Sequence, residues 1–417
     1  MIKQLCQRAI QAETEMHKLP TKTKNTILRE IAKALIAEQD TIIEANKLDL
    51  IAGEEAGLDS ALLDRLALNQ ERIEGMAESL EVIAGFPDPI GEITEGFTTE
   101  SGLSIEKVRS PLGVVAIIYE SRPNVTIDAA GLCLKSSNVT ILRGSSAALN
   151  SNRILAELFN RVGEKHGMPK YTVQLLDDPS RDSLNQLVTQ DKYIDVLIPR
   201  GGKQLKEAML ENATIPMILT GDGTCHIYLD QTSEDEKTIP ILLNAKTQRP
   251  GTCNSVECIL IHQDKNYFAP EIVTAMLKND VKVNLTQNLY NVLPKDLQTK
   301  VYLSGEELFG KEFLSKEVLL HQVDSVETAI EFINLHGTNH SDCILTQSVN
   351  NAEKFLNQVD SAVVYLNAST RFSDGGEFGF GGEIGISTQK LHARGPMGIK
   401  QLTSEKFIVK GQGQIRS

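Results

Sequence analysis

The sequence predicts an α/β fold of two domains, each with a parallel sheet covered by helices. From Gly113 onward, short apolar runs alternate with helical stretches, which is the pattern of successive βαβ units. Tryptophan is absent and aromatic residues make up only 5%, so Ala, Ile, Leu and Val supply the apolar surface, as in sheets packed against many helices. The length of 417 residues allows two or three packed units.

The segment before the first apolar run is charged and helical. Ile27, Ile31 and Leu35 recur at helical spacing, a stop is expected near Gly53, and a second periodic run reaches Ile83. We expect these helices to form an outer layer.

Residues 91–108 alternate between apolar and polar side chains about a Ser101-Gly102 turn, which predicts a β-hairpin. The C-terminal segment QLTSEKFIVKG is expected to add a strand and to pair with the hairpin of another subunit. We therefore interpret the hairpin as an oligomerisation element of a homo-oligomer, a dimer or a tetramer.

Two series of apolar runs predict the two sheets. The first occupies 113–118, 138–142, 172–176, 194–198 and 226–229, and the second occupies 255–261, 281–285, 317–323, 342–346 and 361–367. With a boundary near residue 232, the predicted regions are 1–232, 233–369 and 370–417. Within the last region, residues 370–398 place eight glycines among Arg, Glu and His without a clear period. We interpret them as an ordered loop at a ligand site, with a flexible surface loop as the alternative.

Composition argues against several classes of protein. With 42 Lys and Arg against 55 Asp and Glu, the net charge of −13 argues against a nucleic-acid partner, so an anionic ligand needs a local basic pocket. No apolar stretch of about 18 residues predicts a membrane span, and the charged N-terminus lacks the apolar core of a signal peptide. The six cysteines contain no CxxC pair, which argues against a metal site or a disulfide scaffold. We expect a cytoplasmic protein with reduced thiols.

Cys253 is the first candidate for catalysis. In QRPGTCNSVE it lies at a Gly-containing turn before an apolar strand, where backbone N–H groups can stabilise the oxyanion formed when sulfur attacks a carbonyl. Cys258, within the strand, is expected in the core. A structural role for Cys253 is the alternative.

Asn124 is the second candidate. In YESRPNVTIDAA a polar turn follows the first strand, and Pro123 can open a helix. The amide of Asn124 can donate to an oxyanion, or it only caps that helix.

Two further segments, ILRGSSAALNSN (141–152) and LIPRGGKQLKEA (197–208), run from a strand through a Gly-containing turn into a helix. Helix N-termini bearing Gly, Ser, Arg or Lys suit phosphates. Neither segment matches GxGxxG or GxxxxGK[ST], so neither is a standard nucleotide loop. We expect phosphate binding at one of them, with a plain strand-to-helix turn as the alternative.

The order of these motifs resembles the aldehyde dehydrogenase superfamily, with Asn124 after a strand, basic Arg143 after the next, the turn Gly201-Gly202 and Cys253 opening the second domain. TGDGTCHIYLD, NAKTQRPGTCNSVE and NASTRFSDGGEFGFGGEIGISTQKLHARGPMG resemble, more narrowly, the branch of that superfamily that reduces L-glutamyl 5-phosphate to L-glutamate 5-semialdehyde in proline biosynthesis.

The resemblance implies an NADP-binding first domain, a catalytic second domain and reduction by NADPH. Cys253 would attack the acyl carbon and expel phosphate, and hydride would then reduce the thioester. Asn124 and the backbone N–H of Cys253 would form the oxyanion hole, where one donor is worth about 3 to 4 kcal/mol.

The resemblance also implies which residues bind the cofactor and the substrate. NADPH would be held by Arg143, Gly144, Ser145, Ser146, Gly201, Gly202 and Glu312. The anionic groups of the substrate would be bound by Ser121, Arg122, Arg371, His392 and Arg394, and its ammonium by Glu120 or Asp374. Structural ion pairs are the alternative for the charged residues of the glycine-rich segment. Ser146 stands where NAD-preferring members commonly carry a glutamate, so NADPH is expected over NADH.

Leu219 stands where superfamily members that hydrolyse their thioester carry a glutamate base. Without that base, phosphate and not water is expected to take the acyl group in the reverse direction. The alternatives are that Leu219 is an ordinary core residue, and that Asp222 or Glu257 activates water.

Two other functions stay open. One is another aldehyde dehydrogenase-like reaction, namely oxidation of a free aldehyde or acylation of coenzyme A, against which the glycine-rich segment argues. The other is a non-catalytic oligomeric binding protein, against which the presence of both Cys253 and Asn124 argues. Because glutamyl phosphate is labile, a physical association with glutamate 5-kinase is compatible with this chemistry.

Overall fold

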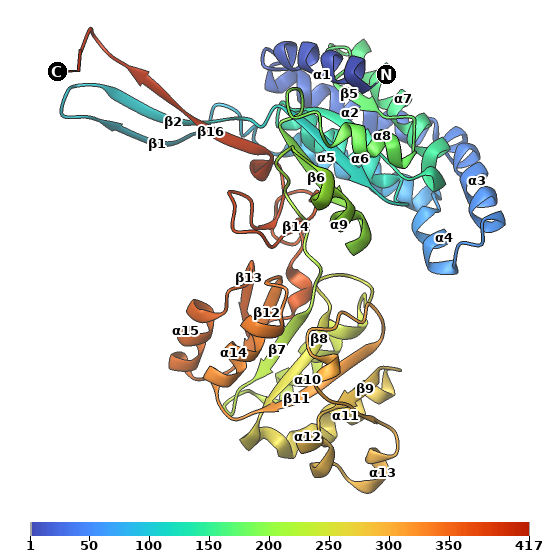
Figure 1. Cartoon of the computed structure of the whole chain (residues 1–417), viewed down its shortest axis with the longest axis vertical. Helices are drawn as coiled ribbons and strands as arrows, with labels where there is room; N and C mark the ends of the chain where they lie inside the picture. The colour runs from blue at the N-terminus through green and yellow to red at the C-terminus, as the bar shows by residue number, and fades with distance from the viewer. Residues whose placement is uncertain (1, 417) are drawn as a thin grey trace. The chain divides into compact units, whose positions relative to one another are not determined.

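The computed structural model describes residues 2–416 and divides the chain into two compact units (Figure 1). Unit 1 contains the residues up to Leu219, together with Gly379–Gly385 and the residues from Met397 onward. Unit 2 contains Thr220–Phe378 and Ile386–Pro396. No helix within residues 2–416 is both long enough and apolar enough to cross a membrane.

Unit 1 is built on a parallel four-stranded sheet in the order β5-β4-β3-β6. Its strands are β3 (Val114–Tyr119), β4 (Val139–Arg143), β5 (Val173–Leu175) and β6 (Val196–Arg200). Its helices are α1 (Ile2–Met16), α2 (Thr21–Ala37), α3 (Gln39–Glu55), α4 (Ser60–Leu66), α5 (Gln70–Gly85), α6 (Asn124–Lys135), α7 (Leu149–Lys165), α8 (Arg181–Leu187) and α9 (Lys203–Asn212). Every residue of β3 is buried, as expected for a central strand of a parallel sheet.

The predicted helical layer is confirmed by α2 to α5, and the stop predicted near Gly53 is confirmed to within two residues. Helix α3 continues to Glu55, and Gly57 follows with φ of +77°. Gly53 lies inside the helix and is buried, where an added Cβ would come within 3.0 Å of Leu58. This glycine therefore allows close packing and does not end the helix.

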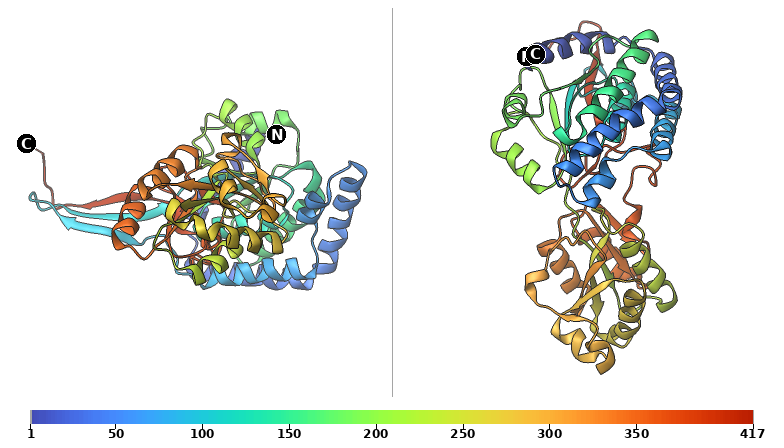
Figure 2. Two further views of the ribbon diagram at one scale, coloured as in Figure 1. Left: turned by 90° about the horizontal axis from the view of Figure 1, so that it is seen from below. Right: turned by 90° about the vertical axis from the view of Figure 1, so that its right-hand side faces the viewer.

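A three-stranded antiparallel arm extends from unit 1, in the order β1-β2-β16 (Figures 1 and 2). It contains β1 (Ile93–Thr98), β2 (Ser104–Pro111) and β16 (Thr403–Lys410). The predicted hairpin is confirmed, and Gly102 in its turn has φ of +84°. The expectation that the C-terminal strand pairs with another subunit is wrong for this structure. Strand β16 pairs along β2 of its own chain, where the ion pair between Lys107 and Glu405 measures 2.7 Å.

Unit 2 is built on a parallel seven-stranded sheet in the order β10-β9-β11-β8-β7-β12-β13. Its strands are β7 (Cys225–Leu229), β8 (Val256–His262), β9 (Lys282–Leu285), β10 (Tyr302–Leu303), β11 (Glu317–Val323), β12 (Ser341–Leu345) and β13 (Val363–Leu366). Its helices are α10 (Asp235–Thr247), α11 (Ala269–Lys278), α12 (Gln287–Val292), α13 (Lys295–Gln298), α14 (Val326–His336) and α15 (Val349–Gln358). Ile259 and Ile261 belong to one buried apolar cluster and Cys258 and Leu260 to another, so both faces of β8 are covered and the core position predicted for Cys258 is confirmed.

The predicted domain boundary near residue 232 is wrong. Strand β7 was assigned to the first sheet, but it pairs with β8 and β12 in unit 2. Its apolar run showed that the strand is buried, but periodicity does not show which sheet a buried strand joins. The boundary lies at Leu219.

Residues 370–417 were predicted to form one region. This prediction is wrong, because the glycine-rich segment does not form one region with the C-terminus. Its residues are divided between the units, and those in unit 2 include a short antiparallel pair, β14 (Ile386–Ser387) and β15 (Gly395–Pro396). Most of the segment is loop, as expected from a sequence without a clear period.

Candidate active site

Cys253 lies in the loop between α10 and β8 and is partly exposed, whereas the other five cysteines are buried. Its peptide group is tightly packed. A Cβ added at Gly223 would come within 1.5 Å of the Cys253 carbonyl oxygen, and the Sγ of Cys225 donates to the same oxygen over 3.1 Å. The backbone of Cys253 is therefore fixed by contacts that do not use its own thiol.

Arg371 contacts the residues on both sides of Cys253. Its Nη1 donates to Oγ1 of Thr252 over 3.0 Å, and its carbonyl oxygen accepts from Nδ2 of Asn254 over 3.4 Å. Its Nε donates to Oε1 of Gln248 over 2.8 Å. The structure thus brings Arg371, predicted for substrate binding, to the Cys253 loop.

Arg249 is a second cation near this loop. Burial lowers the pKa of Arg371, and the charge of Arg249 lowers it further, whereas the negative charges of Asp374 and of ionised Cys253 oppose these shifts. Arg249 was not among the predicted site residues. Its position in the quoted motif QRPGTCNSVE, four residues before Cys253, is the signal that could have found it.

Glu257, named above as another base, lies in a fully buried ion pair with Lys246, with Nζ to Oε2 at 2.6 Å. Burial raises the pKa of Glu257 to about 7, and the Lys246 charge opposes that rise. Because the carboxylate is enclosed and bound to Lys246, it is not placed to activate water. Asp222 is only partly buried.

Glu312 was expected to bind the cofactor. In unit 2 its Oε1 accepts the N–H of Gly223 over 2.8 Å. Since Gly223 packs on the Cys253 peptide, this contact supports the loop that carries the nucleophile.

The other predicted substrate residues of the glycine-rich segment are placed differently. Arg394 donates to Oδ1 of Asp360 over 2.9 Å, so the alternative of a structural ion pair applies to it. Asp360 precedes β13, which is three strands from β8 in the sheet, or roughly 14 Å at about 4.8 Å per strand. His392 is exposed. The structure therefore does not bring Arg394 to the Cys253 loop.

The predicted catalytic, substrate and cofactor residues of unit 1 follow the carboxyl ends of its strands. Ser121, Arg122 and Asn124 follow β3, residues 143–146 end or follow β4, and residues 201–202 follow β6. The strand order reverses between β3 and β6, and dinucleotides bind at such a switch point in parallel sheets.

Two glycines allow close packing at this edge. A Cβ at Gly201 would come within 2.8 Å of the Glu120 side chain, and a Cβ at Gly144 within 2.1 Å of Nδ2 of Asn152. Glu120 is exposed and accepts the N–H of Gly202, the N-cap of α9, over 3.2 Å.

The N-terminus of α7 is already occupied by a carboxylate. Asp49 accepts the N–H of Asn150 over 3.1 Å and that of Ser151 over 2.8 Å. Asp49 lies about a hundred residues earlier, so the sequence motif alone did not indicate this capping. Both predicted phosphate turns therefore have a carboxylate at the start of their helix, Asp49 at α7 and Glu120 at Gly202 before α9.

The side chains after β4 fit a phosphorylated dinucleotide. Arg143 donates from Nη2 to the carbonyl oxygen of Pro179 over 2.6 Å, while its Nε is buried without a hydrogen-bond partner in the described part of the chain. Ser145 and Ser121 share a hydrogen bond of 3.2 Å between their hydroxyls, and Ser146 is exposed. A guanidinium with an unpartnered donor next to a glycine turn suits the phosphate groups of a dinucleotide.

Asn124 opens α6, but its side chain does not cap the helix. Its Nδ2 donates to Oδ2 of Asp128 over 3.0 Å, and burial raises the pKa of Asp128. An amide nitrogen carries two hydrogens, so one remains available to an oxyanion.

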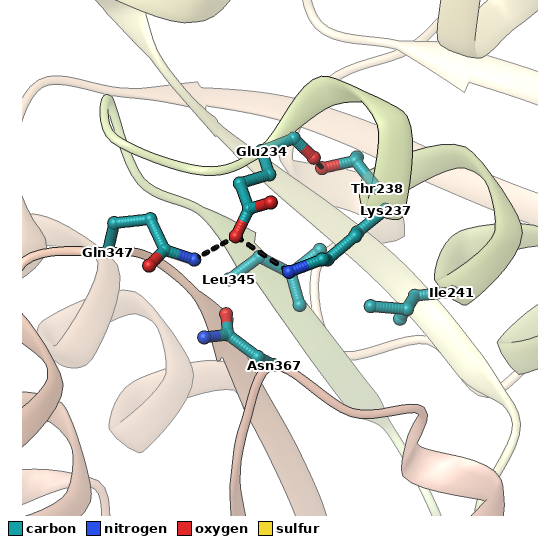
Figure 3. Close-up of a pocket in the computed structure, with 7 residues that line it drawn as sticks. All are labelled: Glu234, Lys237, Thr238, Ile241, Leu345, Gln347 and Asn367. Atoms are coloured by element: carbon teal, nitrogen blue, oxygen red, sulfur yellow. Dashed lines mark hydrogen bonds and ion pairs between the residues drawn. The ribbon is translucent and has the colours of Figure 1, made fainter.

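A small pocket lies at the carboxyl edge of the unit 2 sheet, the edge opposite the Cys253 loop (Figure 3). Glu234 accepts from Lys237 over 2.9 Å and also from Gln347. The free volume is about 10 Å³, room for a single water. This pocket is therefore too small for a substrate.

Comparison with known proteins identifies the family. The model of the aldehyde dehydrogenase family matches residues 1–289. The γ-glutamyl phosphate reductase of Francisella philomiragia is 48% identical over 100% of this chain and 99% of its own, and that of Campylobacter curvus is 48% identical over 95% and 96%.

A solved structure supports the same family assignment. The crystal structure of γ-glutamyl phosphate reductase from Thermotoga maritima superposes with a TM-score of 0.95 at 39% identity, covering 100% of both chains. This likeness confirms the predicted aldehyde dehydrogenase-like fold. The chain belongs to the aldehyde dehydrogenase family, and within it to the γ-glutamyl phosphate reductases.

Proposed function

We propose that the protein reduces L-glutamyl 5-phosphate to L-glutamate 5-semialdehyde and phosphate with NADPH, the second step of proline biosynthesis from glutamate. The observation that carries this proposal is the partly exposed Cys253, whose peptide is fixed by Gly223 and whose neighbours are bound by Arg371. The identity of 48% to named reductases over the full length supports the same reaction.

Cys253 acts as the nucleophile in this proposal. Its sulfur forms a bond to the acyl carbon, the bond from that carbon to the phosphate oxygen breaks, and inorganic phosphate leaves. NADPH, when bound, supplies the hydride that reduces the thioester. The positive charges of Arg371 and Arg249 near the loop favour an anionic sulfur and an anionic leaving group. The Cys253 N–H and the Asn124 amide are the proposed oxyanion donors.

The units have separate proposed roles. Unit 1 binds NADP through residues 143–146 and 201–202 and supplies Asn124, and unit 2 supplies the nucleophile Cys253. Ser121 and Arg122, after β3, remain proposed ligands of the substrate's anionic groups, and Leu219, which is partly buried, replaces the base of hydrolytic relatives.

The proposed function is tested by oxidising glutamate semialdehyde with NADP⁺ while phosphate is varied. We expect the rate to rise at least about tenfold from no phosphate to saturation, because Glu257 is enclosed and no glutamate stands at position 219 to activate water. The products are separated to measure glutamyl phosphate and glutamate. Substantial glutamate formation without phosphate would contradict the proposal, and a requirement for coenzyme A would favour the acylating alternative.

The preference for NADPH gives a second prediction. Ser146→Glu is expected to lower kcat/KM for NADPH by about tenfold or more and to change that for NADH much less, because the new carboxylate repels the 2′-phosphate. Ser146 is exposed, so the variant should fold. Ser146→Gln is the neutral control of the same size. Equal losses with both cofactors would contradict the assignment of Ser146.

The arm supports the proposal of a homo-oligomer. Ile93 and Phe97 on β1 are 57% and 48% exposed, and Phe407 and Val409 on β16 are 63% and 54% exposed, so a second subunit would remove apolar surface from water. A mass measurement in solution tests this. Six free cysteines support a reducing compartment such as the cytoplasm, and the lability of the acyl phosphate supports association with glutamate 5-kinase.

A further inference from the structure

A pocket of about 290 Å³ lies beside the Cys253 loop within unit 2. It is lined by Asn244, Gln248, Arg371, Phe372, Asp374 and Glu377. Small-molecule sites in proteins typically start at about 300 Å³, so this volume suits a ligand the size of an amino acid. The pocket contains one guanidinium and two carboxylates, which is a mixed charge pattern.

Arg371 presents a fixed cation to this pocket. Its Nε and Nη1 are engaged by Gln248 and Thr252, which orients the guanidinium. Its remaining nitrogen, Nη2, has no hydrogen bond within the described residues. A half-buried guanidinium with donor capacity left over is suited to a carboxylate ligand.

The two carboxylates differ in their contacts. Asp374 Oδ1 accepts the N–H of Gly376 over 2.8 Å and that of Glu377 over 3.2 Å, so Asp374 holds the turn. The carboxylate of Glu377 is exposed and makes no hydrogen bond or ion pair to any residue of the described chain 2–416. Glu377 is therefore the carboxylate available to a ligand.

The end of α10 adds to the negative character of this wall. Asn244 lies in its last turn and Gln248 is its C-cap, and a helix C-terminus carries a partial negative charge. A cationic group in this pocket thus meets Glu377, Asp374 and the end of a helix, whereas an anionic group meets Arg371.

We infer that this pocket binds the α-amino acid end of the substrate, with the α-carboxylate on Arg371 and the α-ammonium on Glu377. The inference rests on the proposed function and makes Glu377 a specificity-determining residue. Two methylene groups separate the acyl carbon from the α-carbon, a span of about 4 Å. Arg371 contacts Thr252, the residue directly before the nucleophile, which agrees with this short span.

The test measures protection of Cys253 against alkylation by iodoacetamide, followed by peptide mass spectrometry. L-Glutamate carries both head groups, whereas glutarate lacks only the ammonium. In the unmodified protein, L-glutamate should protect at concentrations about tenfold lower than glutarate, since only L-glutamate carries an ammonium that pairs with the Glu377 carboxylate. Glu377→Gln should remove this difference and leave protection by glutarate unchanged.

Glu271→Gln, an exposed carboxylate on α11, is the matched control and should retain the preference for L-glutamate. Equal protection by both ligands in the unmodified protein, or an equal weakening of both in Glu377→Gln, would overturn the inference. Alkylation needs neither NADP nor turnover. If the preference for L-glutamate is present but the phosphate-dependent reaction is absent, the proposed function fails while the pocket assignment stands.

Discussion

Cys253→Ala is expected to abolish turnover, lowering kcat by about 10⁴-fold or more, because the variant has no sulfur to form the thioester. The fold should persist. The contacts of Gly223 and Cys225 are made to the backbone of residue 253, and the thiol is partly exposed, so its removal leaves no closed cavity. Steady-state rates measure the loss of turnover, and thermal unfolding measures the stability of the fold. The equilibrium binding of NADPH, which should be retained, is measured separately.

Cys6→Ala is the matched control for this variant. Cys6 is fully buried in α1, and burial raises the pKa of its thiol to about 11, so it is an unreactive sulfur. Its replacement should cost some stability and leave kcat unchanged. If Cys253→Ala kept most of its activity, the covalent mechanism would be abandoned.

The strands of the two sheets were predictable because each is an apolar run bounded by turns. The ten predicted runs correspond to β3 to β9 and β11 to β13, most of them shifted by a residue or two at the ends. Strand β10 was not predicted, because it contains only Tyr302 and Leu303 and both are exposed. The hairpin followed from its alternation and its Gly102 turn.

Pairing and long-range capping were not predictable from local patterns. The run that forms β7 reads the same whether it joins the first or the second sheet, and its partners lie about 30 and 115 residues later. Asp49 showed no sign in the sequence of capping α7. Arg371 followed from the family motif, but its contact with Thr252 required the structure. Physical interactions between distant segments thus account for these differences.

The buried pair of Lys246 and Glu257 was also not predictable, although both residues stand in the motif NAKTQRPGTCNSVE. Their side chains are fully buried, with Nζ of Lys246 also donating to the Val256 carbonyl oxygen over 2.9 Å. The Glu257 Oε1 accepts the N–H of Leu314 over 3.4 Å. The Leu314 carbonyl oxygen in turn lies 3.6 Å from the position of a Cβ at Gly251. The pair therefore stabilises the segment around Leu314, which packs against the Cys253 loop.

Lys246→Met is expected to lower the free energy of unfolding by about 3 to 5 kcal/mol, because it leaves a carboxylate buried without its cation. Chemical denaturation followed by circular dichroism measures the loss. The double variant Lys246→Met with Glu257→Leu replaces both charges by apolar groups and should recover most of the stability. A double variant as unstable as Lys246→Met would show that the loss comes from packing and not from the unpaired charge.

The pH dependence of the stability of Lys246→Met further distinguishes an unpaired buried charge from lost packing as the cause of the destabilisation. Burial raises the pKa of Glu257 to about 7 from an unfolded value near 4.5, and removing Lys246 removes the charge that opposes this rise. A carboxyl group whose pKa is raised on folding binds more protons in the native state, so its contribution to stability falls as pH rises between the two values. Lys246→Met should therefore be less destabilised at pH 5, where Glu257 is protonated in the fold, than at pH 8. Adding Glu257→Gln to Lys246→Met should remove this difference, whereas a loss equal at both pH values would exclude the unpaired carboxylate as its cause.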